Sequence, residues 1–125
     1  AFMATAKLSE QQISAELAKL PGWSVESGNL HRAFEFKDFA QAFGFMTQVA
    51  FAAEKMDHHP DWSNAWNKVT IDLSTHSAGG LTKNDFALAG KIQHIHEGCT
   101  LHERACATRR QYIGNQCLWE EAKWK

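Results

Sequence analysis

The chain has 125 residues, of which 44% are apolar and 22% charged, and its formal net charge is −1. This composition predicts one ordinary globular domain that folds without disulfides, and it argues against a dedicated binder of nucleic acids or membrane surfaces. No window reaches the roughly 18 consecutive apolar residues that a membrane-spanning helix needs. We therefore expect a cytoplasmic protein, and a nuclear location also stays open.

The first predicted element is a helix that begins after Ser9. Ser9 and Gln12 have the spacing of a capping box, in which each side chain binds the other residue's backbone N–H. Apolar residues recur at helical spacing from Ile13 to Leu20, and Pro21-Gly22 ends the run.

A β-hairpin and a second helix are predicted next. Apolar residues alternate over 23–25 and 30–36 around a Ser-Gly-Asn turn, which is typical of two antiparallel strands. Asp38 is suited to cap a helix that we expect to run to about Lys55. Its predicted buried face consists of the apolar residues at three- and four-residue spacing. These are Phe39, Ala42, Phe43, Met46, Val49, Ala50 and Ala53.

The second half of the chain repeats this order. Residues 62–66 and 69–73 alternate as strands do, and Asn67-Lys68 between them suits a tight turn. A third helix is expected from Thr82, which has near capping-box spacing to Asp85, to about His96. The order α-β-β-α-β-β-α predicts an α+β two-layer sandwich, in which three helices cover one face of a four-stranded antiparallel sheet.

The last residues differ in character, so we divide the chain into a domain at 1–97 and an atypical extension at 98–125. The extension contains all three cysteines, an odd number without a CxxC motif, which predicts neither a disulfide framework nor a thioredoxin-like site. Continuation of the third helix, packing on a partner subunit and disorder all stay open for this extension.

Three histidines lie at predicted element ends. His58 and His59 lie where the second helix should stop, because Pro60 lacks a backbone N–H and disfavours helical backbone before it. His76 closes a predicted strand, so the three rings could converge. Structural histidines, a zinc site and metal-free acid–base catalysis all stay open, although no HExxH or paired-cysteine motif supports zinc. Acid–base catalysis suits imidazole because its ordinary pKa is about 6.5.

Residues 36–76 contain several specific motifs in order. They are HHP, an aromatic residue two positions after this proline, and Thr-His seventeen residues after the second histidine of the pair, with GLT and Asp85 following. This set closely resembles the pterin-4a-carbinolamine dehydratase family, also known as dimerisation cofactors of a homeodomain transcription factor. The resemblance covers about residues 8 to 96. The family's fold, a four-stranded antiparallel sheet with three helices on one side, agrees with the predicted order.

The resemblance implies a lyase that dehydrates 4a-hydroxytetrahydrobiopterin to quinonoid dihydrobiopterin, which recycles the tetrahydrobiopterin used by aromatic amino-acid hydroxylases. It implies no metal or organic cofactor. Expulsion of the C4a hydroxyl needs a proton donor and loss of the N5 proton needs a base, and imidazoles can supply both. The resemblance assigns catalysis to His58, His59 and His76. The substrate-binding residues that it implies are Glu54, Asp57, Pro60, Trp62, Ser74, Thr75, Ser77 and Asp85.

The resemblance also implies a homodimer or homotetramer, and the composition predicts no direct nucleic-acid or membrane partner. A second function stays open, because animal members of the family bind a transcription factor's dimerisation helix, a role that needs no catalytic histidine. Two of the predicted site residues have simpler explanations. Asp85 could be an ordinary helix-capping acid, and Trp62 could belong to the core.

Overall fold

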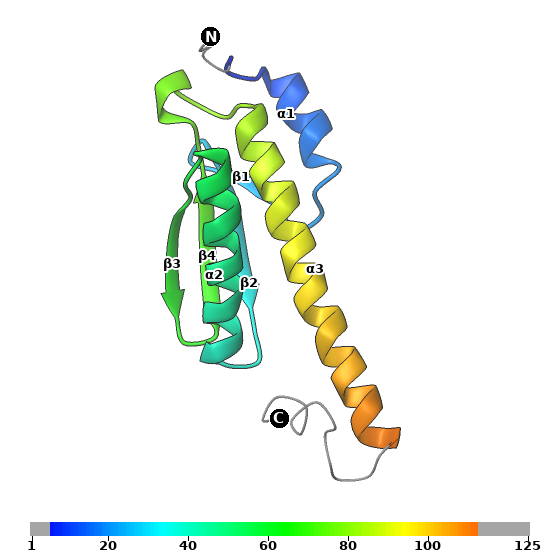
Figure 1. Cartoon of the computed structure of the whole chain (residues 1–125). Coiled ribbons are helices and arrows are strands. Elements are labelled where there is room, and N and C mark those ends of the chain that lie inside the picture. Colours follow the sequence, from blue (N-terminus) through cyan, green and yellow to red (C-terminus); the bar gives the residue numbers. More distant parts are fainter. Residues whose placement is uncertain (1–5, 113–125) are drawn as a thin grey trace. The chain divides into compact units, whose positions relative to one another are not determined.

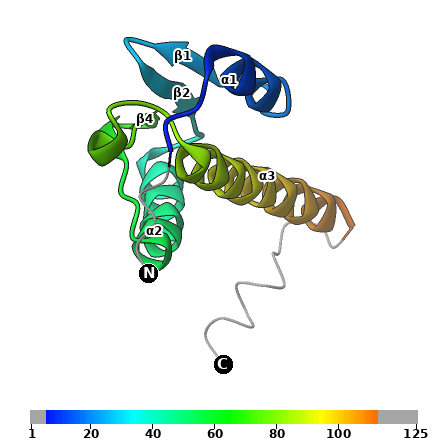
Figure 2. The same ribbon diagram turned by 90° about the horizontal axis from the view of Figure 1, so that it is seen from above.

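The structure, a computed structural model, describes residues 6–112, with side chains described through Cys99. Contacts divide the chain into two units, one ending at Ile95 and the other beginning at His96, and each is considered by itself. The first unit contains a four-stranded antiparallel sheet with helices on one face, as predicted (Figures 1 and 2). Within residues 6–112 no helix combines the length and apolar character of a membrane span.

The elements follow the predicted order. They are α1 (Glu10–Leu17), β1 (Ser24–Glu26), β2 (Asn29–Glu35), α2 (Phe39–Met56), β3 (Asp61–Ala65), β4 (Lys68–Leu73), a short 3-10 helix η1 (His76–Ala78) and α3 (Lys83–Tyr112). The strands lie in the order β1-β2-β4-β3, and each neighbouring pair is antiparallel. The two predicted hairpins are therefore joined through β2 and β4 in the middle of the sheet.

The pairing of β2 with β4 gives the sheet one apolar and one open face. Leu30 lies opposite Leu73 and Phe34 opposite Val69, and all four side chains are buried in the core. Consecutive strand residues point to opposite faces, so His31, next to Leu30, lies on the open face. The helices cover the apolar face (Figure 1).

The predicted helix caps are present. Ser9 Oγ accepts the backbone N–H of Gln12 at 3.3 Å, and Gln12 Oε1 accepts that of Ser9 at 2.9 Å, which completes the capping box. At the start of α2, Asp38 Oδ1 accepts the backbone N–H of Gln41 at 2.8 Å. This helix ends at Asp57, whose left-handed backbone (φ 51°) turns the chain away.

The buried face of α2 differs from the predicted one. The sequence pattern placed Phe39 and Phe43 in the core, but these residues are 51% and 56% exposed, and that prediction was wrong. Phe45, which the prediction left out, is fully buried. Because α2 carries phenylalanines on two sides, three- and four-residue spacing fits either side, and only packing on the sheet decides between them.

Two element ends also differ from prediction. The turn between β3 and β4 is Trp66-Asn67, one residue early, and Trp66 has left-handed backbone (φ 52°). Helix α3 continues to Tyr112 because the sequence has no proline there, and Gly98 alone costs a helix only about 1 kcal/mol. The domain boundary at 97 stays a prediction, and residues 113–125 of the predicted extension lie outside the described residues.

One buried carboxylate joins three elements of the first unit. Asp85, in the first turn of α3, is fully buried. Its Oδ2 accepts the backbone N–H of Thr82 and the hydroxyl of Thr75, both at 2.9 Å. Its Oδ1 lies 2.6 Å from Nε2 of His58. The start of α3 is thus bonded to the segment after β4 and to the segment after α2.

Gly22 and Gly28 offer a test of the packing around the first hairpin. Both have positive φ (+88° and +79°), but an added Cβ would lie 2.9 Å from Arg32 Cζ at Gly22 and would meet nothing within 4 Å at Gly28. We expect Gly28→Ala to lower the free energy of unfolding by roughly 1 to 2 kcal/mol, the cost of left-handed backbone for alanine. Gly22→Ala should cost more, because it also displaces the Arg32 guanidinium from its hydrogen bond to the Pro21 carbonyl. Urea unfolding compares them, and equal losses would contradict the contact with Arg32.

Asp85 and Asp38 provide a second matched pair. Asp38→Ala removes an exposed cap and should lower the free energy of unfolding by about 1 kcal/mol. Asp85→Ala should cost at least about 3 kcal/mol, because it leaves three donors in a buried site without an acceptor. Urea unfolding measures both losses. A similar loss in the two variants would mean that Asp85 contributes no more than an ordinary cap.

Candidate active site

The two adjacent histidines have different surroundings. The left-handed turn at Asp57 and the following Pro60 direct His58 inward, where only 10% of its side chain is exposed and Nε2 meets Asp85. His59 is 58% exposed, and its Nε2 lies 3.1 Å from Oε2 of Glu54, in the last turns of α2. At the turn formed by His58-His59-Pro60, the HHP corner, a buried carboxylate therefore holds the ring of His58, and the ring of His59 is open to a ligand.

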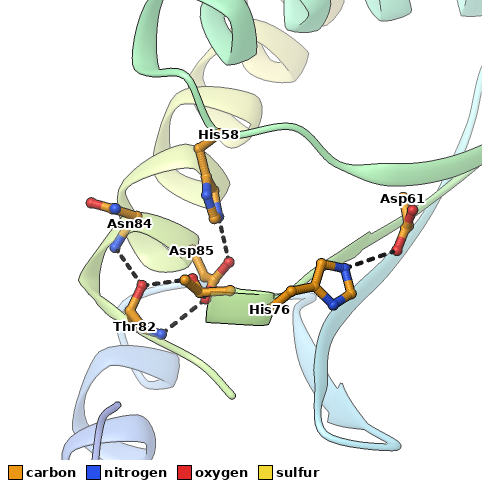
Figure 3. Close-up of polar contacts among 7 residues, drawn as sticks. His58, Asp61, His76, Thr82, Asn84 and Asp85 are labelled. Atoms are coloured by element: carbon orange, nitrogen blue, oxygen red, sulfur yellow. Dashed lines mark hydrogen bonds and ion pairs between the residues drawn. The ribbon is translucent and has the colours of Figure 1, made fainter. Parts of the chain in front are cut away.

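His76 lies at the same end of the sheet. It begins η1 with 88% of its side chain exposed, and its Nε2 is 4.0 Å from Oδ2 of Asp61, at the start of β3. Its neighbour Thr75 donates to Asp85. Asp85 also binds His58 (Figure 3). The segment after β4 is thus linked to the HHP corner by two routes, one through Asp61 and one through Asp85.

A small polar cavity lies beside His76. Its volume is about 300 Å³, at the lower end of the range for small-molecule pockets. It is lined by Ser27, Gly28, Asn29, Ser74, Thr75, His76, Gly79 and Gly80. The pairing of Leu30 with Leu73 brings the β1–β2 turn to this place. The sequence did not predict Ser27, Gly28 and Asn29 as site residues, because their pattern indicates only a hairpin turn and they lie far from His76 in the chain.

The remaining predicted residues surround this end of the sheet. Asp57 is exposed, and its backbone N–H closes the last turn of α2. Pro60 is half-buried and Ser77 is exposed in η1. Trp62 is also half-buried and packs against the core. Ser74 lines the cavity, so the predicted residues do not all face one surface.

The chemistry available here is that of imidazoles beside carboxylates. His59 and His76 are exposed next to Glu54 and Asp61, so their rings can give protons to a ligand or take them from it. Within the described part of the chain, no group of three or more His, Cys, Asp or Glu side chains is arranged to hold a metal ion. The arrangement suits proton transfer between a small polar ligand and the side chains.

Comparison with known sequences identifies relatives. The family model described as pterin 4 alpha carbinolamine dehydratase matches residues 6–95. A candidate pterin-4-alpha-carbinolamine dehydratase of Solibacter usitatus is 51% identical over 94 residues, which is 75% of this chain and 99% of the relative. A candidate of the same description from Mesorhizobium japonicum is 51% identical over 98 residues, 77% of this chain and 100% of the relative.

Comparison with solved structures gives the same result. The crystal structure of a transcriptional coactivator/pterin dehydratase from Brucella melitensis superposes with a TM-score of 0.70 and 45% sequence identity. The match covers 71% of this chain and 97% of the Brucella chain. The family model includes all four strands, the HHP corner and Asp85. This chain therefore belongs to the pterin 4 alpha carbinolamine dehydratase family and is a dehydratase.

Proposed function

We propose that this enzyme dehydrates 4a-hydroxytetrahydrobiopterin to quinonoid dihydrobiopterin by metal-free histidine acid–base catalysis, and so recycles tetrahydrobiopterin for aromatic amino-acid hydroxylases. One observation carries the proposal. His58, His59 and His76 come from two segments at one end of the sheet, and each ring has a carboxylate partner. Family membership supports the same reaction.

The reaction requires two proton transfers and no redox step. The bond between C4a and the hydroxyl oxygen breaks as an acid protonates that oxygen, so that water leaves. The C4a–N5 double bond forms as a base removes the N5 proton. Imidazoles populate both protonation states near neutral pH, so one ring can act as the acid and another as the base.

The exposure of the rings indicates how they divide this work. His59 and His76 are open to solvent and can approach the substrate directly, and each has a carboxylate, Glu54 or Asp61, beside its Nε2. We place the pterin against His76 and the cavity that Ser74 helps to line. We place the His58 ring, which Asp85 fixes, on the inner side of this ligand, since Asp85 is also bonded to Thr75 of the cavity lining.

The catalytic proposal has a direct test with a matched control. We expect the protein to accelerate decay of the 4a-hydroxytetrahydrobiopterin absorbance, generated in situ by a hydroxylase, in the presence of a chelator. His59→Ala and His76→Ala should each lower this acceleration by roughly 10²-fold or more, because each removes a positioned acid or base. His31→Ala should change it little, since His31 pairs with Asp72 on the open face of the sheet.

Three results would contradict parts of this proposal. A decay no faster than the spontaneous rate would overturn the enzymatic function. Loss of the acceleration on adding the chelator would overturn metal-free catalysis. An equal loss in His31→Ala would show that the assay reports folding, which circular dichroism of each variant checks independently.

We also propose that the chain is a cytoplasmic homodimer or homotetramer. Phe39, Phe43 and Phe51 leave three large aromatic side chains exposed along α2, and an exposed apolar patch is typical of a protein–protein interface. Size-exclusion chromatography with light scattering should find an oligomer at micromolar concentration, and Phe43→Glu should shift it toward a smaller species. A monomeric unmodified protein would contradict this proposal.

The description of the Brucella relative also names a transcriptional coactivator. The alternative function is therefore non-catalytic binding of a transcription factor's dimerisation helix. The histidine variants separate the two functions, since they should lower the acceleration of dehydration strongly and leave binding of such a helical peptide unchanged. A protein that binds the peptide but does not accelerate dehydration would favour the alternative.

A further inference from the structure

We propose that Asp85, held by Thr75 and Thr82, is a positioning residue that fixes the His58 ring so that Nδ1 is the nitrogen that exchanges a proton with the substrate. The role of Nδ1 in the reaction rests on the proposed function. The state of the ring rests only on hydrogen bonds inside the protein. Asp85, Thr75 and Thr82 are all buried, so the hydrogen bonds among them do not need a bound ligand.

The direction of each hydrogen bond can be assigned. The Thr75 hydroxyl has one proton, and it donates this proton to Asp85 Oδ2 at 2.9 Å. Because that proton is used, the 2.8 Å hydrogen bond between the two threonines must be donated by the Thr82 hydroxyl and accepted by Thr75 Oγ1. The backbone N–H of Asn84 in turn donates to Thr82 Oγ1 at 3.3 Å (Figure 3). The chain of donors runs in one direction, toward the carboxylate.

This chain fixes how the carboxylate is turned. Oδ2 of Asp85 receives two protein donors, the hydroxyl of Thr75 and the backbone N–H of Thr82, so Oδ1 is the oxygen that faces His58. An imidazole is a stronger base than a carboxylate, so the proton between them lies on Nε2. The neutral ring then carries its lone pair on Nδ1, and the charged ring carries its second proton there.

Replacing the carboxylate by an amide should invert this arrangement. In Asp85→Asn the amide oxygen must occupy the Oδ2 position, because Thr75 and Thr82 both donate there. The NH₂ group then takes the Oδ1 position and donates to Nε2 of His58. The ring can accept this bond only by moving its own proton to Nδ1. The base that faces the substrate is lost, although the hydroxyl of Thr75, the N–H of Thr82 and Nε2 of His58 each keep a partner.

The tautomer can be measured by NMR on the full chain with ¹⁵N-labelled histidine, well above the ordinary imidazole pKa of about 6.5. We expect His58 to carry its proton on Nε2 in the unmodified protein and on Nδ1 in Asp85→Asn. His58→Gln identifies the signal. A His58 ring protonated on Nδ1 in the unmodified protein, or the same tautomer in both proteins, would overturn the inference.

Thr75 provides a second measurement that does not require Asp85→Asn to fold. Thr75→Val removes the donor to Asp85 at nearly constant volume, whereas Thr75→Ser keeps it. We expect the Nε2 proton of His58 to exchange with water about tenfold faster in Thr75→Val than in the unmodified protein, and within about twofold in Thr75→Ser. Equal exchange in the two variants would show that the hydroxyl does not hold Asp85.

The activity assay distinguishes this inference from the proposed function. The NMR measurements use no pterin, so a protein with the expected tautomer but no dehydration would overturn the proposed function alone. Asp85→Asn should also lower kcat at least about tenfold with a smaller change in KM, since the inverted ring removes a base and leaves the binding surface in place. Full activity in a folded Asp85→Asn with an inverted ring would overturn the role of Nδ1.

Discussion

The bond between Asp85 and His58 is the constraint on which the rest of this site depends. A carboxylate loses its hydration when it is buried, and it is stable there only if donors replace the water. Those donors come from the segment after α2, the segment after β4 and the start of α3. The Thr82 donor is local to the start of α3, but the Thr75 and His58 donors come from other segments, so the ring of His58 acquires its orientation from the tertiary fold.

Asp85 combines two roles that are usually separate. Through Thr82 it occupies the acid position of a helix capping box, and through Oδ1 it holds a histidine. A cap on the surface is free to exchange its partner for water, whereas this one is enclosed. The same carboxylate therefore caps α3 and holds the His58 ring, so a substitution that moves the start of α3 should also move this ring. His59 and His76, by contrast, are exposed and have carboxylate partners near the surface.

Local patterns in the sequence predicted much of this structure. The capping spacing at Ser9, the cap at Asp38 and the alternation of the two hairpins depend on neighbouring residues, and they are confirmed. The buried side of α2 was predicted wrongly, because both of its sides are apolar and only the sheet distinguishes them. His58, His59 and His76 were proposed as catalytic from motifs and a family resemblance, and this assignment stays a prediction. Thr82 was predicted only as the start of a helix. Its hydrogen bond to Thr75 could not be predicted, because the fold brings the two hydroxyls together.

The left-handed backbone of Asp57 has a consequence for the entropy of the HHP corner. An L-residue in this conformation carries a steric cost that glycine would avoid, so the folded state gives up some stability at this position. A glycine, however, would widen the set of conformations open to the unfolded chain just before the two histidines. With aspartate, the unfolded chain has fewer conformations to lose on folding, and this offsets part of the local strain in the folded corner.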